Sequence, residues 1–350
     1  MTPRATGTSQ ETAAAASRLP ESDPLSGVRL PTMADVERAR EVISAYLRPT
    51  PLLNTPALDD RLGFLGYLKC ENLQPVGAFK VRGGLFLMSD LSPDERARGV
   101  VTASTGNHGQ SIAYAAREFG VPATIFAPEG ANPLKVASMR RLGAEVRFAG
   151  RDFDESREAA ERDAEGRGAY FVASANDWRL IAGVATYTVE MLEAVPDLDV
   201  LIVPAGGGSG LSGACLAAKH LAPAVRVVGV QAAGAPAVYE TWRTGRLSET
   251  ERADTFADGL ATRVAFSLPA QILWPLLDDF RLVTDGEMRR AILTMLETAR
   301  VLAEGAGAAA LAAAHAMREE LAGRKVGIVV SGGNLTLDTL AETLAMEQPW

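Results

Sequence analysis

GVVTASTGNHGQSIAYAAREFGVPATIFAP, residues 99–128, contains two short apolar runs with a helical pattern between them. The runs at 99–104 and 122–128 have the length and continuous hydrophobicity of buried strands. Residues 107–120 carry apolar side chains at helical spacing and end at Gly120, a residue typical of helix C-termini. A strand, a helix and a second strand in this order predict two neighbouring parallel strands.

The same alternation continues outward in both directions. Continuous apolar strands that alternate with helices predict an α/β fold whose parallel sheets are covered on both faces. The block from 98 to 177 contains its own set of strands, so we expect two parallel-sheet domains. The expected division is a disordered tail at 1–30, a large domain formed by 31–97 and 178–350, and a small domain at 98–177.

Composition excludes several classes of protein. The net charge of −8 is unfavourable for binding a phosphate backbone, so nucleic acid is not an expected partner. The two cysteines, Cys70 and Cys215, have no metal-like spacing and fit a reducing compartment. No apolar run reaches the roughly 20 residues of a membrane span, and the first residues lack the apolar core of a signal peptide. We therefore expect a cytoplasmic location and no membrane partner.

One lysine stands in an unusual setting, ENLQPVGAFKVRGG at residues 71–84. Lys80 has glycines on both sides, which a surface lysine rarely needs. A backbone without side chains allows a flat molecule to lie close to it.

A second glycine-rich stretch, PAGGGSGLSG at 204–213, lies between a predicted strand and a predicted helix. Its bare backbone N–H groups and the helix N-terminus favour a phosphate. The formal G-x-G-x-x-G at Gly208, Gly210 and Gly213 also allows a nicotinamide-binding interpretation, which requires an acidic residue about 20 positions later. The next strand ends in Gln231 instead. A purely structural glycine turn is the other alternative.

Two further loops follow predicted strands. ASTGNHGQS, at 103–111, offers hydroxyls and N–H groups that could hold a carboxylate. His108 within it is either a packed, hydrogen-bonded histidine or part of the site. SGGN, at 331–334, ends a later strand. Ligands in open α/β sheets bind at the carboxyl ends of strands, and a lysine with a phosphate loop and a carboxylate loop there favours pyridoxal phosphate.

These motifs together resemble the serine/threonine dehydratase and serine racemase family of fold-type II pyridoxal-phosphate enzymes, whose fold is tryptophan synthase β-like. ENLQPVGAFKVRGG is similar to the family's lysine motif, although Ala78 stands where serine is usual. STGNHGQS, GGGSGLSG and SGGN resemble the carboxylate, phosphate and pyridine-nitrogen motifs. FADGLA and AEGAGAAALAA resemble two later family stretches. The resemblance covers about residues 30–345 and places the cofactor between the two domains.

The resemblance implies a set of site residues. Lys80 carries the Schiff base and Phe79 packs beside the ring. Asn107 lies near the cofactor, Glu304 lies near its ring, and Ser331 faces its nitrogen. Thr105 is the candidate for a second proton-transfer group. The remaining roles are the phosphate loop and the substrate contacts: Gly206, Gly207, Gly208, Ser209 and Gly210 for the phosphate, and Ser104, Thr105, Gly106, Asn107, His108 and Asn176 for the substrate.

The implied activity is that of an ammonia-lyase, which eliminates water from L-threonine or L-serine and yields a 2-oxo acid and ammonia. The alternatives are a serine-type racemase, or a dehydratase of a bulkier or acidic β-hydroxy amino acid. A non-catalytic cofactor-binding protein is disfavoured because Lys80 is retained. A homodimer is expected from the resemblance. Many relatives bind a divalent cation through carboxylates at positions that here are Gln231 and Ala237, so we expect no metal. The chain ends 16 residues after Asn334, so no C-terminal regulatory domain is expected.

Overall fold

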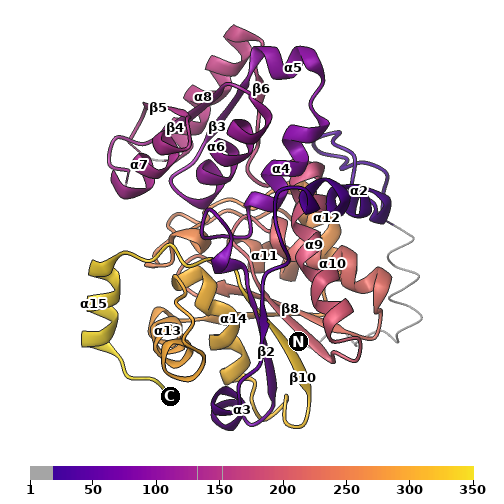
Figure 1. Ribbon diagram of the computed structural model, residues 1–350, viewed down its shortest axis with the longest axis vertical. Coiled ribbons are helices and arrows are strands. Elements are labelled where there is room, and N and C mark those ends of the chain that lie inside the picture. Colours follow the sequence, from indigo (N-terminus) through magenta and orange to yellow (C-terminus); the bar gives the residue numbers. More distant parts are fainter. Residues whose placement is uncertain (1–18, 132, 152) are drawn as a thin grey trace.

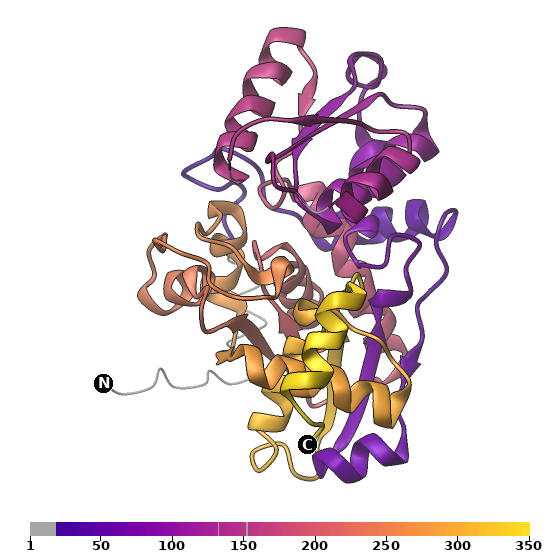
Figure 2. The same ribbon diagram turned by 90° about the vertical axis from the view of Figure 1, so that its left-hand side faces the viewer.

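The computed structural model describes residues 19–131, 133–151 and 153–350. The polypeptide forms two α/β bodies stacked along the long axis of the molecule (Figures 1 and 2). One body contains a four-stranded sheet and the other a six-stranded sheet. No helix in the described residues is both long enough and apolar enough to cross a membrane.

The four-stranded sheet has the order β5-β4-β3-β6, and all of its neighbouring strands are parallel. The quoted stretch forms its centre, because β3, α6 and β4 are the predicted strand, helix and strand. Gly120 ends α6 in the left-handed conformation at φ 65°, as the sequence predicted. The elements of this body are α5 (Pro93–Arg98), β3 (Val100–Ala103), α6 (Asn107–Phe119), β4 (Ala123–Ala127), α7 (Pro133–Arg141), β5 (Glu145–Phe148), α8 (Phe153–Arg167) and β6 (Tyr170–Phe171).

The six-stranded sheet has the order β1-β2-β10-β7-β8-β9 and is parallel except for the antiparallel edge strand β1. Leu201 and Val203 of β7 enter one apolar cluster, whereas Ile202 between them enters another on the opposite face. Both faces are therefore buried, which explains why the strand sequences are continuously apolar. The strands are β1 (Leu52–Leu53), β2 (Leu65–Cys70), β7 (Val200–Pro204), β8 (Arg226–Ala232), β9 (Asp279–Val283) and β10 (Lys325–Val330).

Helices cover the two faces of this larger sheet. One cluster joins the sheet to α3, α13 and α14, and the other joins it to α9, α10 and α12. A third cluster, with residues from α2, α4, α6 and α9, packs the four-stranded body against the rest. The elements of the larger body are α2 (Met33–Ser44), α3 (Pro56–Leu62), η1 (Glu71–Leu73), α4 (Val81–Asp90), α9 (Trp178–Ala194), α10 (Ser209–Leu221), α11 (Ala237–Thr244), η2 (Asp258–Leu260), α12 (Ser267–Leu276), α13 (Asp285–Ala299), α14 (Gly305–Ala316) and α15 (Leu337–Met346).

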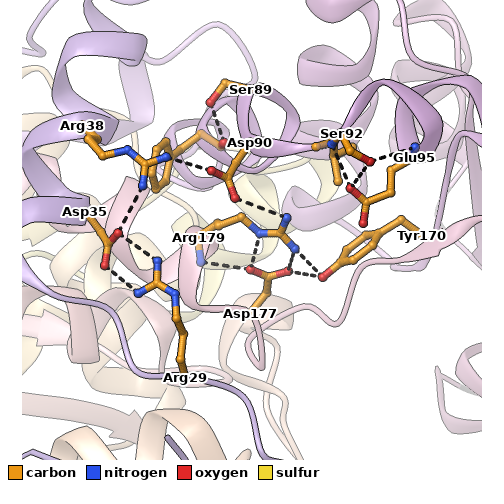
Figure 3. A network of polar contacts seen from close by, with 12 residues as sticks. Arg29, Asp35, Arg38, Ser89, Asp90, Ser92, Glu95, Tyr170, Asp177 and Arg179 are labelled. Atoms are coloured by element: carbon orange, nitrogen blue, oxygen red, sulfur yellow. Dashed lines mark hydrogen bonds and ion pairs between the residues drawn. The ribbon is translucent and has the colours of Figure 1, made fainter. Parts of the chain in front are cut away.

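The two segments that connect the bodies meet at Arg179 (Figure 3). The chain enters the four-stranded body after α4 and leaves it after β6. Arg179 forms ion pairs with Asp177 at 2.8 Å and with Asp90, the last residue of α4, at 3.7 Å. It also donates to the hydroxyl of Tyr170 in β6. One guanidinium therefore ties both connections together.

The start of the described chain differs from the expectation of a disordered tail that extends to residue 30. Residues 1–18 lie outside the described residues. Within residues 19–30, Leu19 and Val28 pack against apolar clusters and Asp23 and Leu30 are buried, whereas residues 20–22 and 24–27 are exposed. The Asp23 carboxylate accepts hydrogen bonds from the backbone N–H groups of Leu25 and Ser26, which compensates its burial. Thr32 then caps α2 in a capping box with Asp35.

Candidate active site

All of the expected site residues line one cavity of about 700 Å³. Loops from the carboxyl ends of strands in both sheets form its walls, which is the position that ligands take in open α/β sheets. The expected residues in the lining are Phe79, Lys80, Ser104, Thr105, Gly106, Asn107, His108, Asn176, Gly206, Gly207, Gly208, Ser209, Gly210, Glu304 and Ser331.

Lys80 points toward the start of α10. Its Nζ donates to the hydroxyl of Ser209 at 3.4 Å and to the carbonyl of Ser174 at 3.5 Å. Removal of the ammonium from water lowers the pKa of Lys80 to about 8. A much larger fraction of this amine is therefore neutral near pH 7 than for an ordinary lysine, and the neutral amine is the nucleophilic form.

The backbone before Lys80 is held by the loop that follows β10. The Phe79 N–H donates to the carbonyl of Ser331 at 3.0 Å, and Ala78 forms an isolated antiparallel bridge with Gly332. Gly77 has φ 68°, and a Cβ there would lie 2.5 Å from Oδ1 of Asn334. The glycine before the lysine is therefore needed both for its backbone conformation and for this close approach.

A buried charge network lies behind the lysine segment. Arg82 donates to both carboxylate oxygens of Glu71 at 2.8 Å and to Glu190 at 2.6 Å. Lys69 donates to Glu190 at 2.5 Å. Two cations and two anions therefore balance, as buried charges require. Because Glu71 and Arg82 flank the loop that carries Lys80, their pairing fixes both ends of that loop. Nothing in the local sequence indicated this network.

The glycine loop at 206–210 leads directly into α10. Gly208 is the N-cap residue at φ 94°, and no side chain of the described residues caps the helix there. A Cβ on Gly206 would overlap the carbonyl of Gly259, and one on Gly210 would lie 2.9 Å from the Phe79 ring. Uncapped N–H groups and the positive helix end suit an anion such as the cofactor phosphate.

The carboxylate loop, Ser104–His108, leads into α6. The Ser104 hydroxyl accepts hydrogen bonds from the N–H groups of Gly106 at 3.1 Å and Gly109 at 2.8 Å. Thr105 is exposed to the cavity. The loop therefore presents backbone and hydroxyl groups rather than charges.

His108 is buried beneath this loop. Its Nε2 lies 3.0 Å from the hydroxyl of Thr102, which donates its own proton to the carbonyl of Val172. The Thr102 oxygen is therefore the acceptor and His108 the donor. Burial, together with the charge of Lys80, lowers the pKa of His108 to about 3. These contacts support the packed, neutral interpretation of the histidine.

A chain of side-chain amides leads to the cavity lining at Asn107 and Glu304. Nδ2 of Asn334 donates to the carbonyl of Val76 at 2.9 Å and to Oδ1 of Asn107 at 2.7 Å. A backbone carbonyl can only accept, so the contact with Val76 identifies the Asn334 atom as the Nδ2 donor. Its second partner on Asn107 must then be the acceptor oxygen, and the orientation of both amides is fixed. Asn107 then donates to Glu304 at 2.6 Å. Burial raises the pKa of the Glu304 carboxyl.

Asn176, in the segment between β6 and α9, supports another part of the cavity wall. Its Oδ1 accepts from the N–H of Leu268 at 3.0 Å, and its Nδ2 donates to Ser267 at 3.3 Å. It therefore holds the start of α12 next to Phe266, which lines the cavity.

Several charged residues in the cavity lining are not among the site residues predicted from the sequence. Lys135 of α7 forms an ion pair with Asp258 of η2, and Arg157 forms one with Glu161 at 2.7 Å along α8. Asp258 belongs to the FADGLA stretch, which had indicated a family likeness without a role for this residue. Nothing in the local sequence distinguished Lys135.

Gln231 stands at the position where the resemblance places a metal-binding carboxylate in many relatives. Oε1 of Gln231 accepts from the N–H groups of Val238 at 3.1 Å and Tyr239 at 3.0 Å, at the start of α11. Within residues 19–131, 133–151 and 153–350, no group of three or more His, Cys, Asp or Glu side chains could hold a metal ion.

Comparison with known proteins places these features in context. A sequence model of the family described as "Pyridoxal-phosphate dependent enzyme" matches residues 43–332. The chain is 41% identical to an L-threonine ammonia-lyase of Thermotoga maritima, over 88% of this chain and 77% of that protein. It is 36% identical to an L-threo-3-hydroxyaspartate ammonia-lyase of Saccharomyces cerevisiae, over 90% and 97%. The structure of maize serine racemase has a TM-score of 0.85 and 31% identity, over 90% of this chain and 97% of that one.

Proposed function

This chain belongs to the family of pyridoxal-phosphate-dependent enzymes, and we propose that it eliminates water from a β-hydroxy amino acid of the threonine or serine type. The products are a 2-oxo acid and ammonia. The observation that carries the proposal is the partly neutral amine of Lys80, which faces the uncapped helix start at Ser209. The ammonia-lyase relatives support the reaction.

The residues present fit the cofactor. We assign its phosphate to the loop at 206–210, its covalent attachment to Lys80 and its ring nitrogen to Ser331. Pyridoxal phosphate supplies an aldehyde for the substrate amine and a ring that withdraws electrons from Cα. Gly210 leaves room beside the Phe79 ring, which in turn packs edge-to-face on Tyr187 at 6.1 Å.

Proton movements are then assigned to side chains of this protein. Lys80 would hold the cofactor when no substrate is bound, and its free amine would take the proton from Cα when substrate occupies the site. The C–O bond to the β-hydroxyl breaks, and the hydroxyl takes up one proton and leaves as water; the proton taken from Cα balances this uptake. One water molecule is then consumed in hydrolysing the C=N bond of the 2-imino acid, which gives the 2-oxo acid and ammonia. Ser331 supplies a neutral hydroxyl where a carboxylate would keep the ring nitrogen protonated, and this favours elimination over reactions that need a stronger electron sink.

A racemase is the second candidate function, and Thr105 is the observation that favours it. Its side chain is exposed to the cavity, and a hydroxyl there could exchange a proton with Cα on the side away from Lys80. A β-branched threonine is conformationally restricted, and we assign it instead to the substrate carboxylate.

The proposal includes an organisation for the molecule. We propose that residues 98–177 act as a small substrate-loop domain on a large cofactor-binding domain formed by 31–97 and 178–350. The two sheets and the clamp at Arg179 support this division. We also propose a cytoplasmic homodimer on the basis of the family resemblance. Sedimentation of the purified protein tests the dimer.

A panel of β-hydroxy amino acids tests the function. Both enantiomers of threonine, serine, 3-hydroxyaspartate and 3-phenylserine should be incubated with the holoenzyme, and both 2-oxo acid and ammonia should be measured. We expect equal amounts of the two products from L-threonine or L-serine. Turnover confined to hydroxyaspartate or phenylserine would favour the acidic or bulkier substrate class. No ammonia from any member, with inversion at Cα, would favour the racemase.

A further inference from the structure

Lys135 and Asp258 meet across the cavity from elements 123 residues apart in the sequence. Lys135 belongs to α7, beside the four-stranded sheet, and Asp258 belongs to η2, next to the phosphate loop. Their exposures differ greatly, because the side chain of Lys135 is 11% exposed and that of Asp258 is 65% exposed. An ion pair with so exposed a carboxylate contributes little net free energy. Another carboxylate could therefore replace Asp258 at small cost.

The Lys135 ammonium lies against the carboxylate loop. Its Nζ would be 3.6 Å from a Cβ placed on Gly106, the residue that precedes α6. Its charge is also the largest influence that opposes the raised pKa of Glu304. The ammonium is therefore adjacent to the Ser104–His108 loop and close enough to influence the Glu304 carboxyl.

That loop itself supplies no full positive charge. Ser104 already accepts two backbone hydrogen bonds, and His108 is buried, neutral and bonded to Thr102. The start of α6 adds only the partial charge of a helix terminus. A substrate carboxylate at the loop would leave water for a site of hydroxyls and amides, and this is costly unless a cation lies nearby.

The other cations in the lining, Lys80, Arg157 and Arg263, are placed differently. Arg263 is exposed in the segment that follows η2, where its backbone carbonyl accepts a hydrogen bond from the N–H of Thr250. Lys80 points toward Ser209 and is committed to the reaction in the proposed function. Arg157 pairs with Glu161 on its own helix. Lys135 is the cation whose position against Gly106 is suited to the loop.

We propose that Lys135 is a substrate-binding residue whose ammonium pairs with the α-carboxylate of the amino acid at the Ser104–His108 loop. Asp258 forms an ion pair with this ammonium when no amino acid is bound, and the incoming substrate carboxylate displaces it. The assignment deepens the proposed function, since it rests on this cavity as the site of an amino acid. It adds a charged contact that the loop motif alone does not contain.

Two ligands that cannot undergo elimination distinguish the contribution of the carboxylate to binding from that of the rest of the substrate. Glycine and glycinamide both carry an α-amine and lack a β-hydroxyl, but only glycine has a carboxylate. Each is titrated into the holoenzyme, and its dissociation constant is read from the change in cofactor absorbance. For Lys135→Met we expect glycine to bind about 10- to 100-fold more weakly, the scale of one charge-assisted contact. Glycinamide should change less than about 2-fold, within the uncertainty of such contacts. Lys135→Arg should retain most of the glycine affinity.

Matched controls isolate the position of the charge. Lys325 forms an ion pair with Asp197 far from the cavity lining, so Lys325→Met removes the same type of pair and should leave both dissociation constants unchanged. Asp258→Asn should leave glycine binding equal or tighter. If Lys135→Met does not fold, Lys135→Gln is titrated in its place.

Three results would overturn the assignment. These are equal weakening of glycine and glycinamide in Lys135→Met, no weakening of either ligand, or weaker glycine binding in Asp258→Asn. Because the titration needs no turnover, its outcome is independent of the panel that tests elimination. A failed panel with a Lys135-dependent glycine affinity would reject the reaction and keep this contact.

Discussion

Nζ of Lys80 lies 3.4 Å from Oγ of Ser209, the first residue of α10. The only candidate nucleophile that the sequence singled out therefore faces the helix start to which we assign the cofactor phosphate. The two residues are separated by 129 positions and are joined only by the tertiary fold. The predictions below follow from this relationship and from the loops around it.

The first prediction concerns the pH dependence of cofactor capture. Burial lowers the pKa of Lys80 to about 8 from 10.5, so its amine becomes neutral at lower pH than an ordinary lysine. Capture of pyridoxal phosphate by the apoenzyme should rise about 10-fold per pH unit below pH 8 and level off above it. The rate at which Nα-acetyl-lysine reacts with pyridoxal phosphate is measured over the same pH range, and this reference corrects for ionisation of the cofactor itself. A rate that keeps rising to pH 10.5 would contradict the lowered pKa.

Ser331 gives the second prediction. Ser331→Asp should keep the ring nitrogen protonated and slow elimination by about 100-fold or more, the scale of one strong electrostatic contribution. Ser331→Ala serves as the control, since it removes the hydroxyl without adding a charge, and it should retain more activity. Turnover is measured by 2-oxo acid release. Unchanged turnover in Ser331→Asp would mean that this residue only ends β10.

The third prediction distinguishes a lyase from a racemase. Thr105→Ala should weaken substrate binding by about 10-fold, as for one hydrogen bond to a charged group, while elimination survives. Both enantiomers are followed by chiral chromatography. Inversion at Cα at least as fast as elimination, abolished in Thr105→Ala, would make the enzyme a racemase.

Divalent cations give the fourth prediction. Oε1 of Gln231 is already bonded to the N–H groups of Val238 and Tyr239, and hard cations prefer carboxylate ligands. Addition of magnesium or calcium should therefore not activate turnover through this position, and a chelator should leave turnover unchanged. Activity lost on chelation and restored by magnesium would argue against the expectation.

The sequence was most informative where hydrophobic patterns decide structure. The continuous apolar runs of β7 and β8 required a sheet covered on both faces, and their loops then had to share one edge. It was least informative about polar residues that gain a partner only through packing. Nothing near Lys135 indicated Asp258, and nothing near Asn107 indicated Asn334. Composition also suggested disorder around Asp23, whose burial depends on hydrogen bonds within its own turn.

Reduction of the holoenzyme with borohydride tests the central claim most directly. Borohydride fixes the cofactor to the amine that carries it, and mass spectrometry of a digest locates the label. We predict one labelled peptide that contains Lys80, and no label in the Lys80→Ala variant. A label on Lys69, which is buried in the charge network, or on Lys135 would contradict the assignment of the site.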